Sequence, residues 1–261
     1  MTAPAVVTGI GEVFRVFDQQ DSGCVSYGVR RGSERYFVKT ATTPAADRSL
    51  RRAVEVHGAV QHPALVAPVR VEPDGDGIAL VYPWVDGDVL YHATVGPDGR
   101  ATSARRDDPG SPLARFRGLP LPAVRRAIST ILEAHVPVDE AGLVAVDLYD
   151  GCFLYDWAAD AVRIIDVDEY RRGPFVPDTQ LPGSTRFYAP EEVGVGQVVD
   201  RRTTVFRLGR VARLLLDAGD TESAWRGSGA ELEVIARATH RDPDQRFQSV
   251  ADLVAHWHAA G

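Results

Sequence analysis

Alternating apolar and polar positions dominate the first third of the chain and predict β-strands there. Five segments have the alternation or the short apolar run of a strand, namely residues 11–19, 24–31, 35–41, 64–71 and 77–85. Turn-prone sequences such as QQDSG and EPDGDG separate them, and residues 49–61 have helical spacing that ends before His62-Pro63. We therefore expect this part to form a five-stranded antiparallel sheet with one helix.

Helical spacing takes over after Asp86-Gly87-Asp88, where the alternation breaks. Residues 93–120 show little periodicity and predict a long loop. Helices are predicted at residues 122–135 and 204–219 and in two parts of residues 229–260. The pattern as a whole predicts an α+β protein with a β-rich N-terminal lobe, residues 1–85, and a mainly helical C-terminal lobe, residues 86–261.

Carboxylates follow two short apolar runs between these helices. Residues 143–146 lead to Asp147, and residues 162–165 lead to Asp166 and Asp168, with a predicted hairpin over residues 152–165. Paired carboxylates at the ends of rigid runs suit proton abstraction and divalent-metal binding, although a surface hairpin with solvated acids is the alternative. Lys39 lies inside an apolar strand, where it either points outward or needs an anionic partner.

Composition narrows the classes of function. Of the 261 residues, 44% are apolar and 25% are charged, as in ordinary globular proteins. A net charge of -7 and the absence of a basic run argue against a nucleic-acid surface, and two cysteines exclude a disulfide framework or a four-cysteine zinc site. No apolar run reaches membrane-spanning length, so we expect a cytoplasmic protein without a membrane partner.

Several stretches resemble, in order, the motifs of divergent bacterial members of the eukaryotic-type Ser/Thr protein-kinase superfamily, which is related to the aminoglycoside phosphotransferase-like kinases. They cover residues 12–255 and are FVKTA at Lys39, QHPALVAPV, VDLYDGC with Asp147 and Cys152, IIDVD at Asp166, GSTRFYAPEE, TVFRLGRVARLLL and RDPDQRF. The resemblance implies a two-lobed protein-kinase-like fold that binds ATP between the lobes and uses Mg²⁺.

The same resemblance implies a role for each matching residue. Asp147 would accept a proton from the acceptor hydroxyl, Lys39 would hold the phosphates, and Asp166 would bind Mg²⁺. Cys152 and Asp168 occupy or neighbour further metal-binding positions. The remaining nucleotide contacts implied are Gly23, Val25, Glu55, Tyr82, Pro83, Val85 and Leu154. Glu191 and Arg246 would form a structural salt bridge.

Departures from the family pattern affect both lobes. The nucleotide-covering loop retains only Gly23 of three glycines, and Ala53 stands where the lysine's glutamate partner is expected, so Glu55 reaches Lys39 only if the helix register shifts. Cys152 replaces a metal-binding asparagine, although a thiol is a poor ligand for Mg²⁺. Thr204 replaces an aspartate of the central helix, which predicts the loss of an anchor for the loop that carries Asp147.

Three functions are consistent with these residues. The first is an ATP-dependent phosphotransferase acting on Ser/Thr hydroxyls of proteins, favoured by the segment 183–192. The second is an O-phosphotransferase for a small molecule such as an aminoglycoside or another antibiotic, favoured by acidic surroundings and by Tyr149, which stands where protein kinases carry lysine. The third is a catalytically impaired pseudokinase that acts as a binding module, favoured by Cys152 and the reduced glycine loop.

Overall fold

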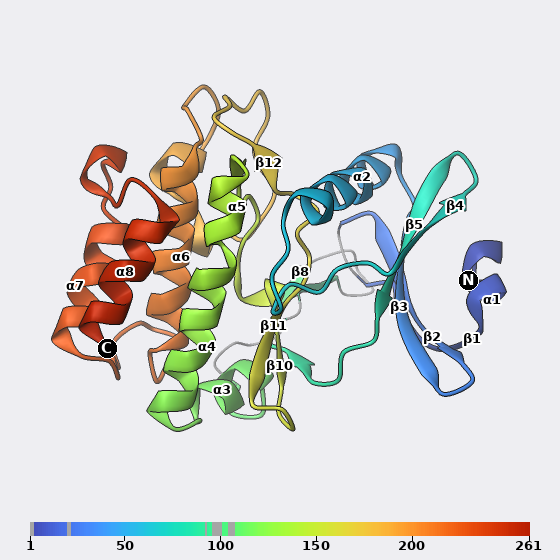
Figure 1. Ribbon diagram of the computed structural model, residues 1–261, viewed down its shortest axis with the longest axis horizontal. Coiled ribbons are helices and arrows are strands. Elements are labelled where there is room, and N and C mark those ends of the chain that lie inside the picture. Colours follow the sequence, from blue (N-terminus) through green and yellow to red (C-terminus); the bar gives the residue numbers. More distant parts are fainter. Residues whose placement is uncertain (1–2, 20–21, 92, 96–100, 104–107) are drawn as a thin grey trace.

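A five-stranded antiparallel sheet forms one end of the molecule and a group of helices forms the other (Figure 1). The computed structural model describes residues 3–19, 22–91, 93–95, 101–103 and 108–261. The strands, in the order β1-β2-β3-β5-β4 across the sheet, are β1 Glu12–Phe17, β2 Cys24–Arg31, β3 Glu34–Ala41, β5 Gly77–Pro83 and β4 Arg70–Asp74. The predicted α+β class and the five-stranded antiparallel sheet are confirmed.

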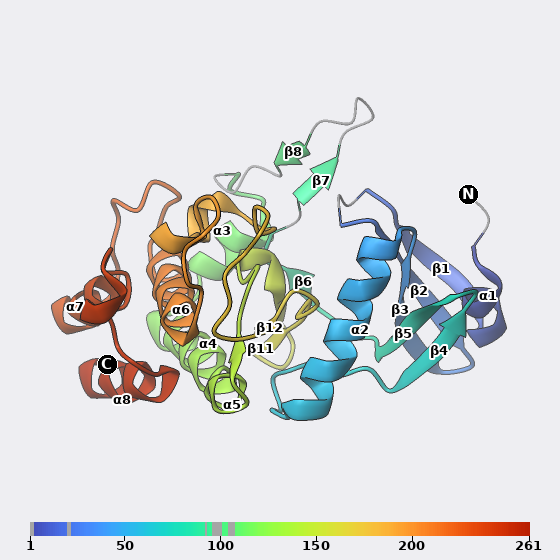
Figure 2. The same cartoon turned by 90° about the horizontal axis from the view of Figure 1, so that it is seen from above.

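Each face of this sheet is covered by a different helix. Helix α1, Ala5–Ile10, packs on the face that carries Val25 and Val38, whereas α2, Pro44–Ala59, packs on the face that carries Cys24 and Leu80. Because successive residues of a strand point to opposite faces, this pairing fixes which side chains of β2 and β3 turn toward α2 and the rest of the molecule. Figure 2 shows α2 between the sheet and the helical part.

Helix α2 begins one turn earlier than its apolar spacing predicts. The hydroxyl of Thr43 accepts a hydrogen bond from the backbone N–H of Ala46, and Pro44 occupies the first helical position. Both features favour the start of a helix, because a capping oxygen satisfies a free N–H and proline has none to satisfy.

The fourth strand differs from its prediction. It begins at Arg70 rather than at residue 64, and the preceding apolar residues leave the sheet. The backbone N–H of Val66 donates to the carbonyl of Ile164, and the N–H of Ile164 donates to Ala64, at 3.0 and 2.7 Å. Residues 64–66 therefore pair with β11, Ala161–Ile164, which belongs to a second sheet. An apolar run predicts a strand but does not specify which strand it pairs with.

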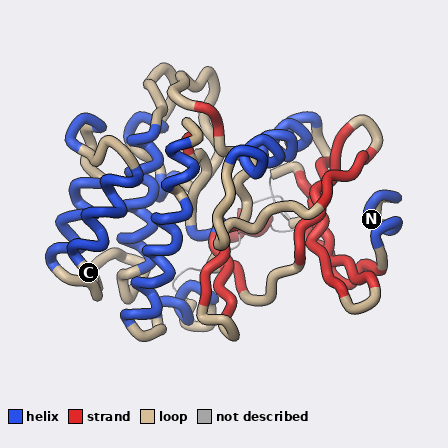
Figure 3. Tube along the Cα trace, viewed as in Figure 1, coloured by secondary structure: helices blue, strands red, loops and turns tan. Residues whose placement is uncertain are grey.

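The remaining elements form the helical part and its small sheets (Figure 3). The helices are α3 Pro112–Arg117, α4 Leu121–Ala134, α5 Val136–Glu140, α6 Arg201–Leu215, α7 Gly229–Ala238 and α8 Val250–Ala260. Single 3₁₀ turns are η1 Asp150–Cys152, η2 Thr185–Phe187, η3 Pro190–Glu192 and η4 Pro243–Gln245. The short strands are β6 Asp88–Val89, β7 Ala93–Val95, β8 Ala101–Ser103, β9 Leu143–Val144, β10 Phe153–Asp156, β11 Ala161–Ile164 and β12 Arg171–Arg172.

The predicted loop over residues 93–120 is wrong where the structure describes it. Strands β7 and β8 pair with each other. Helix α3 begins at Pro112, directly after Ser111, whose side chain caps it, and Leu113 and Phe116 are buried. Residues 96–100 and 104–107 of this prediction lie outside the described residues. Two buried apolar residues in six are too few for a helical period to be recognised.

The hairpin and the central helices follow the sequence pattern closely. Strands β10 and β11 pair antiparallel from Phe153 with Ile164 to Asp156 with Ala161, and the apolar stripe of α4 is buried. The predicted bridge between Glu191 and Arg246 is confirmed, with Nη1 2.7 Å from Oε1 and Nη2 2.9 Å from Oε2. None of the helices in the described ranges is both long and apolar enough to cross a membrane.

Candidate functional site

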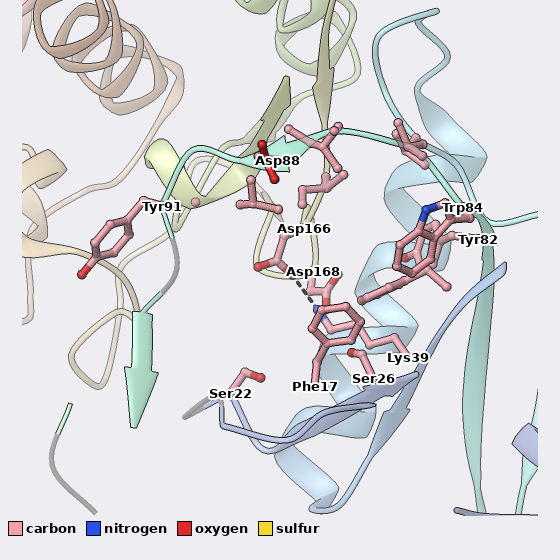
Figure 4. Close-up of a pocket in the computed structure, with 18 of the residues that line it drawn as sticks. Phe17, Ser22, Ser26, Lys39, Tyr82, Trp84, Asp88, Tyr91, Asp166 and Asp168 are labelled. Atoms are coloured by element: carbon pink, nitrogen blue, oxygen red, sulfur yellow. Dashed lines mark hydrogen bonds and ion pairs between the residues drawn. The ribbon is translucent and has the colours of Figure 1, made fainter. Parts of the chain in front are cut away.

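A pocket of about 260 Å³ lies between the five-stranded sheet and the hairpin of β10 and β11 (Figure 4). Its walls come from β1 to β3, from the segment that connects β5 to β6, and from the two loops that carry the carboxylates. The sequence-predicted residues that line it are Lys39, Tyr82, Pro83, Val85, Asp147, Leu154, Asp166 and Asp168. Those that do not line it are Gly23, Val25, Glu55 and Cys152.

One end of the pocket is a cluster of opposite charges. The Nζ of Lys39 lies 2.6 Å from Asp166 and 2.5 Å from Asp168, and only 8% of Lys39 is exposed. Burial lowers the pKa of Lys39, but the two carboxylates outweigh it and raise the pKa well above the usual value. Burial also raises the pKa of Asp168 to about 6, despite the attraction of Lys39. Lys39 therefore points inward as a cation with two anionic partners.

Both pocket aspartates that end an apolar run have a left-handed backbone. The φ angle is 61° at Asp147 and 63° at Asp166. Residues other than glycine rarely adopt this left-handed backbone conformation, and aspartate is among the few types that tolerate it. Such strained positions cluster at functional sites, because the surrounding structure must hold them there. Both residues line the pocket, so the strained backbone holds two carboxylates at its wall.

Helix α6 anchors the loop that carries Asp147. The hydroxyl of Thr204 accepts from the N–H of Ala145 at 3.0 Å, and Nη1 of Arg207 donates to the carbonyl of Leu148 at 3.1 Å. Both side chains are fully buried. The prediction that Thr204 removes an anchor is therefore wrong, since its hydroxyl holds the backbone directly.

Cys152 joins the two carboxylate loops from behind. Its thiol donates to the carbonyl of Asp147 at 3.3 Å and lies 4.0 Å from the carbonyl of Asp166. Burial raises the pKa of this thiol well above its usual value, so it stays protonated. The predicted metal-binding role of Cys152 is wrong on this geometry, because the sulfur faces backbone carbonyls and a metal requires a thiolate.

Helix α2 is tied to the site through an arginine and not through a glutamate. Nε of Arg52 donates to the carbonyl of Asp168 at 3.0 Å, and its Nη2 donates to Glu169. Ser49 also donates to Glu169, at 2.6 Å. Glu55 is exposed on α2 and does not reach Lys39, so its predicted role is wrong. Asp168 and Asp166 supply the negative charge that a helix glutamate was expected to supply.

The other end of the pocket is aromatic, and sequence reasoning missed most of it. Phe17 lies 5.6 Å from Phe37 and 6.5 Å from Trp84, measured between ring centroids, and Phe37 lies 6.4 Å from Tyr82. The signal was present in β3, because Phe37 is two residues before Lys39 and therefore shares its face. No described residue forms a hydrogen bond with the backbone N–H or C=O of Val85.

The same alternation corrects the expected contact at Val25. Val25 is buried against α1 on the far face of the sheet, and Ser26 lines the pocket in its place. Ser26 pairs across the strands with Lys39, so the two side chains point the same way. The family motif pointed to Val25, one residue before the residue that lines the pocket. Because side chains of a strand alternate between the two faces of the sheet, a shift of one residue places the side chain on the opposite face.

The open side of Asp147 is bordered by the segment before η2 and by Tyr149. A Cβ atom on Gly183 would lie 2.6 Å from Oδ1 of Asp147, so this glycine packs directly on the carboxylate. The ring of Tyr149 lies 6.4 Å from Tyr91 and from Phe187. The carboxylate therefore faces a space with aromatic and acidic walls, to which Asp88 also contributes.

No protein-family model matches the chain, and a search of curated proteins finds no relative of it. The site must be interpreted from its own chemistry. The site combines a buried cation, partly exposed carboxylates on two loops, and an aromatic end that is bordered by the backbone N–H and C=O of Val85. Among the described residues, no group of three or more His, Cys, Asp or Glu side chains could hold a metal ion.

Proposed function

We propose that the chain is an ATP-dependent phosphotransferase with a two-lobed, protein-kinase-like fold, which moves the γ-phosphate to a hydroxyl acceptor. The observation that carries this proposal is the meeting of Lys39, Asp147 and Asp166 at one end of a pocket whose other end is aromatic. A cation for phosphates, a carboxylate for the acceptor proton and a flat slot for a base are the parts that phosphoryl transfer needs. The lobe division at residues 85 and 86 remains a prediction.

The aromatic end suits the adenine base. Phe17, Phe37 and Trp84 offer faces and edges on which a planar ring can stack. The Val85 backbone offers one donor and one acceptor, the pair that the edge of adenine complements. The base would then lie beside the segment that connects β5 to β6, with the phosphates toward Lys39.

The donor set of the site is compatible with Mg²⁺ through Asp166. The Asp166 side chain is 39% exposed, and its oxygens are of the hard type that Mg²⁺ prefers. Magnesium sites commonly use one or two carboxylates and complete the shell with phosphate oxygens and water, so a larger protein cluster is not required. Bound Mg²⁺ would supply neutralising charge to the phosphates, and Lys39 would add to it.

The transfer step assigns Asp147 the acceptor proton. The acceptor hydroxyl oxygen forms a bond to the γ-phosphorus while the bond from that phosphorus to the bridging oxygen breaks and ADP leaves. The proton of the hydroxyl passes to the Asp147 carboxylate. The anchors at Ala145 and Leu148 keep the carboxylate in place, because positioning provides most of the catalysis in this reaction.

A Ser/Thr side chain is the acceptor we favour. The segment 183–192 borders Asp147 at Gly183 and is fixed by two buried ion pairs, from Glu191 to Arg246 and from Glu192 to Arg207. A rigid segment beside the carboxylate is suited to hold an extended acceptor. A cationic small molecule such as an aminoglycoside is the alternative, because the neighbouring carboxylates would attract it.

A second candidate function is a nucleotide-binding or scaffold module without turnover. The observation that favours it is the buried Cys152 thiol, which takes up a position behind both carboxylates and adds no metal ligand. In this case Lys39 and Asp166 would serve binding alone.

The deciding experiment measures nucleotide binding and phosphate transfer separately. Thermal unfolding with ATP and Mg²⁺ should show a higher melting temperature than unfolding without them. Labelled phosphate should move from ATP to the chain, a protein substrate, or one of a panel of aminoglycosides and nucleosides. Transfer should be lost in Asp147→Asn and Asp166→Asn but kept in Asp178→Asn, which alters an exposed acid. Binding without transfer would favour the module, and no binding at millimolar ATP would refute both functions.

A further inference from the structure

The hydroxyl of Ser26 is buried in the pocket without a hydrogen-bond partner among the described residues. Ser26 is 0% exposed, lines the pocket and lies beside Lys39 and Phe17 (Figure 4). Nearly all buried polar side-chain atoms in folded proteins have a partner, so each exception requires an explanation. A lone hydroxyl that destabilises the free protein is explained if a ligand uses it.

The position of Ser26 specifies which part of a ligand it would meet. On β2 it pairs with Lys39 of β3, and Gly28, two residues on, pairs with Phe37. Lys39 marks the charged end of the pocket and Phe37 the aromatic end, so the hydroxyl lies on the wall near the charged end. Gly28 has no side chain, and the rings of Phe14 and Trp84 approach it closely. Ser26 is therefore the polar group that β2 offers to a ligand there.

We propose that Ser26 is a nucleotide-binding residue whose hydroxyl bonds an oxygen of the ribose or of the α-phosphate. This inference rests on the proposed function, because it takes the base to lie at the aromatic end and the phosphates at Lys39. The oxygens that join these two parts of a nucleotide belong to the sugar and the first phosphate. A hydroxyl can donate to a phosphate oxygen and can donate to or accept from a sugar hydroxyl.

The test is the variant Ser26→Ala, which should be at least as stable as the natural chain although it loses a buried polar group. Removing a buried hydroxyl that has no partner leaves no broken hydrogen bond, so the melting temperature should stay the same or rise. The affinity for ADP, measured by calorimetry, should fall about five- to tenfold, the effect of one lost hydrogen bond. Ser33→Ala, at an exposed turn far from the pocket, should bind ADP as the natural chain does.

Adenosine and AMP then identify the atom that Ser26 contacts. A sugar contact predicts that Ser26→Ala binds both more weakly, whereas a phosphate contact predicts weaker binding of AMP alone. Equal ADP affinity in Ser26→Ala and the natural chain would overturn the assignment of Ser26 and leave the proposed function standing. A clearly lower melting temperature in Ser26→Ala would also overturn it, because the hydroxyl would then be structural. Failure of the natural chain to bind ADP would overturn both.

Discussion

Replacement of Arg207 should lower the stability of the protein and disturb the site at the same time. Its Nε lies 3.0 and 2.9 Å from the carboxylate oxygens of Glu192, its Nη2 lies 2.7 Å away, and Nη1 holds Leu148. Both members of the ion pair are fully buried. Glu192 also accepts from the N–H of Ala189 at 2.9 Å. Methionine at position 207 would keep much of the volume and remove every hydrogen bond that Arg207 donates, leaving Glu192 with the N–H of Ala189 alone among these partners.

The cost follows from the groups that Arg207→Met leaves behind. A buried carboxylate without its partner costs about 3–5 kcal/mol, and the unpaired carbonyl of Leu148 adds about 1 kcal/mol. The free energy of unfolding should therefore fall by roughly 4–6 kcal/mol. At about 2–4 °C per kcal/mol for a chain of this size, the melting temperature should fall by roughly 8–24 °C.

Urea unfolding followed by circular dichroism measures this loss. Glu192→Gln alone should also destabilise the protein strongly, because it leaves the buried guanidinium of Arg207 without a charged partner. The double variant with Arg207→Met should lose less free energy of unfolding than the two single variants together. Arg126→Met is the control, because its ion pair with Asp160 is exposed and should be worth less than about 1 kcal/mol. A loss in Arg207→Met no larger than in this control would refute the reasoning.

Three further predictions concern pH, the lysine and the acceptor side. Burial lowers the pKa of His135 to about 4, below the usual value near 6.5, so its contribution to stability is complete above pH 6.5 and is lost as the pH falls toward 4. In urea unfolding across this range, His135 should account for a loss of about 3 kcal/mol, so His135→Gln should lose less stability than the natural chain. Asp168→Asn should weaken ATP binding about tenfold in calorimetry, because Lys39 loses its buried partner; unchanged affinity would contradict this role. Gly183→Ala should lower turnover more than about tenfold with little change in ATP affinity, because its Cβ would collide with Asp147, and normal turnover would exclude that contact.

Periodicity predicted the elements whose burial on one side is continuous. The strands β2 and β3, the hairpin of β10 and β11, and the helices α4, α6, α7 and α8 all repeat apolar residues at the spacing that their geometry requires. Strand β1 was predicted from the same alternation, although its residues are exposed or only half-buried. The same reasoning located Lys39, Asp147 and Asp166, because each is a charged residue within or directly after an apolar run. Elements with short or shared apolar segments were predicted poorly: β4 was misplaced, and α3 lies in a segment that was predicted as a loop.

The sequence by itself determined the order of the main strands and helices, the α+β class and the charged residues at the ends of the apolar runs, because these depend on neighbours along the chain. Only the tertiary structure decided that Ser26 and not Val25 faces the pocket, since α1 covers one face of the sheet and α2 the other. It also decided that Asp168 and not Glu55 pairs with Lys39, and that Cys152 bonds carbonyls. These outcomes depend on distances between segments up to 129 residues apart, which no local pattern encodes.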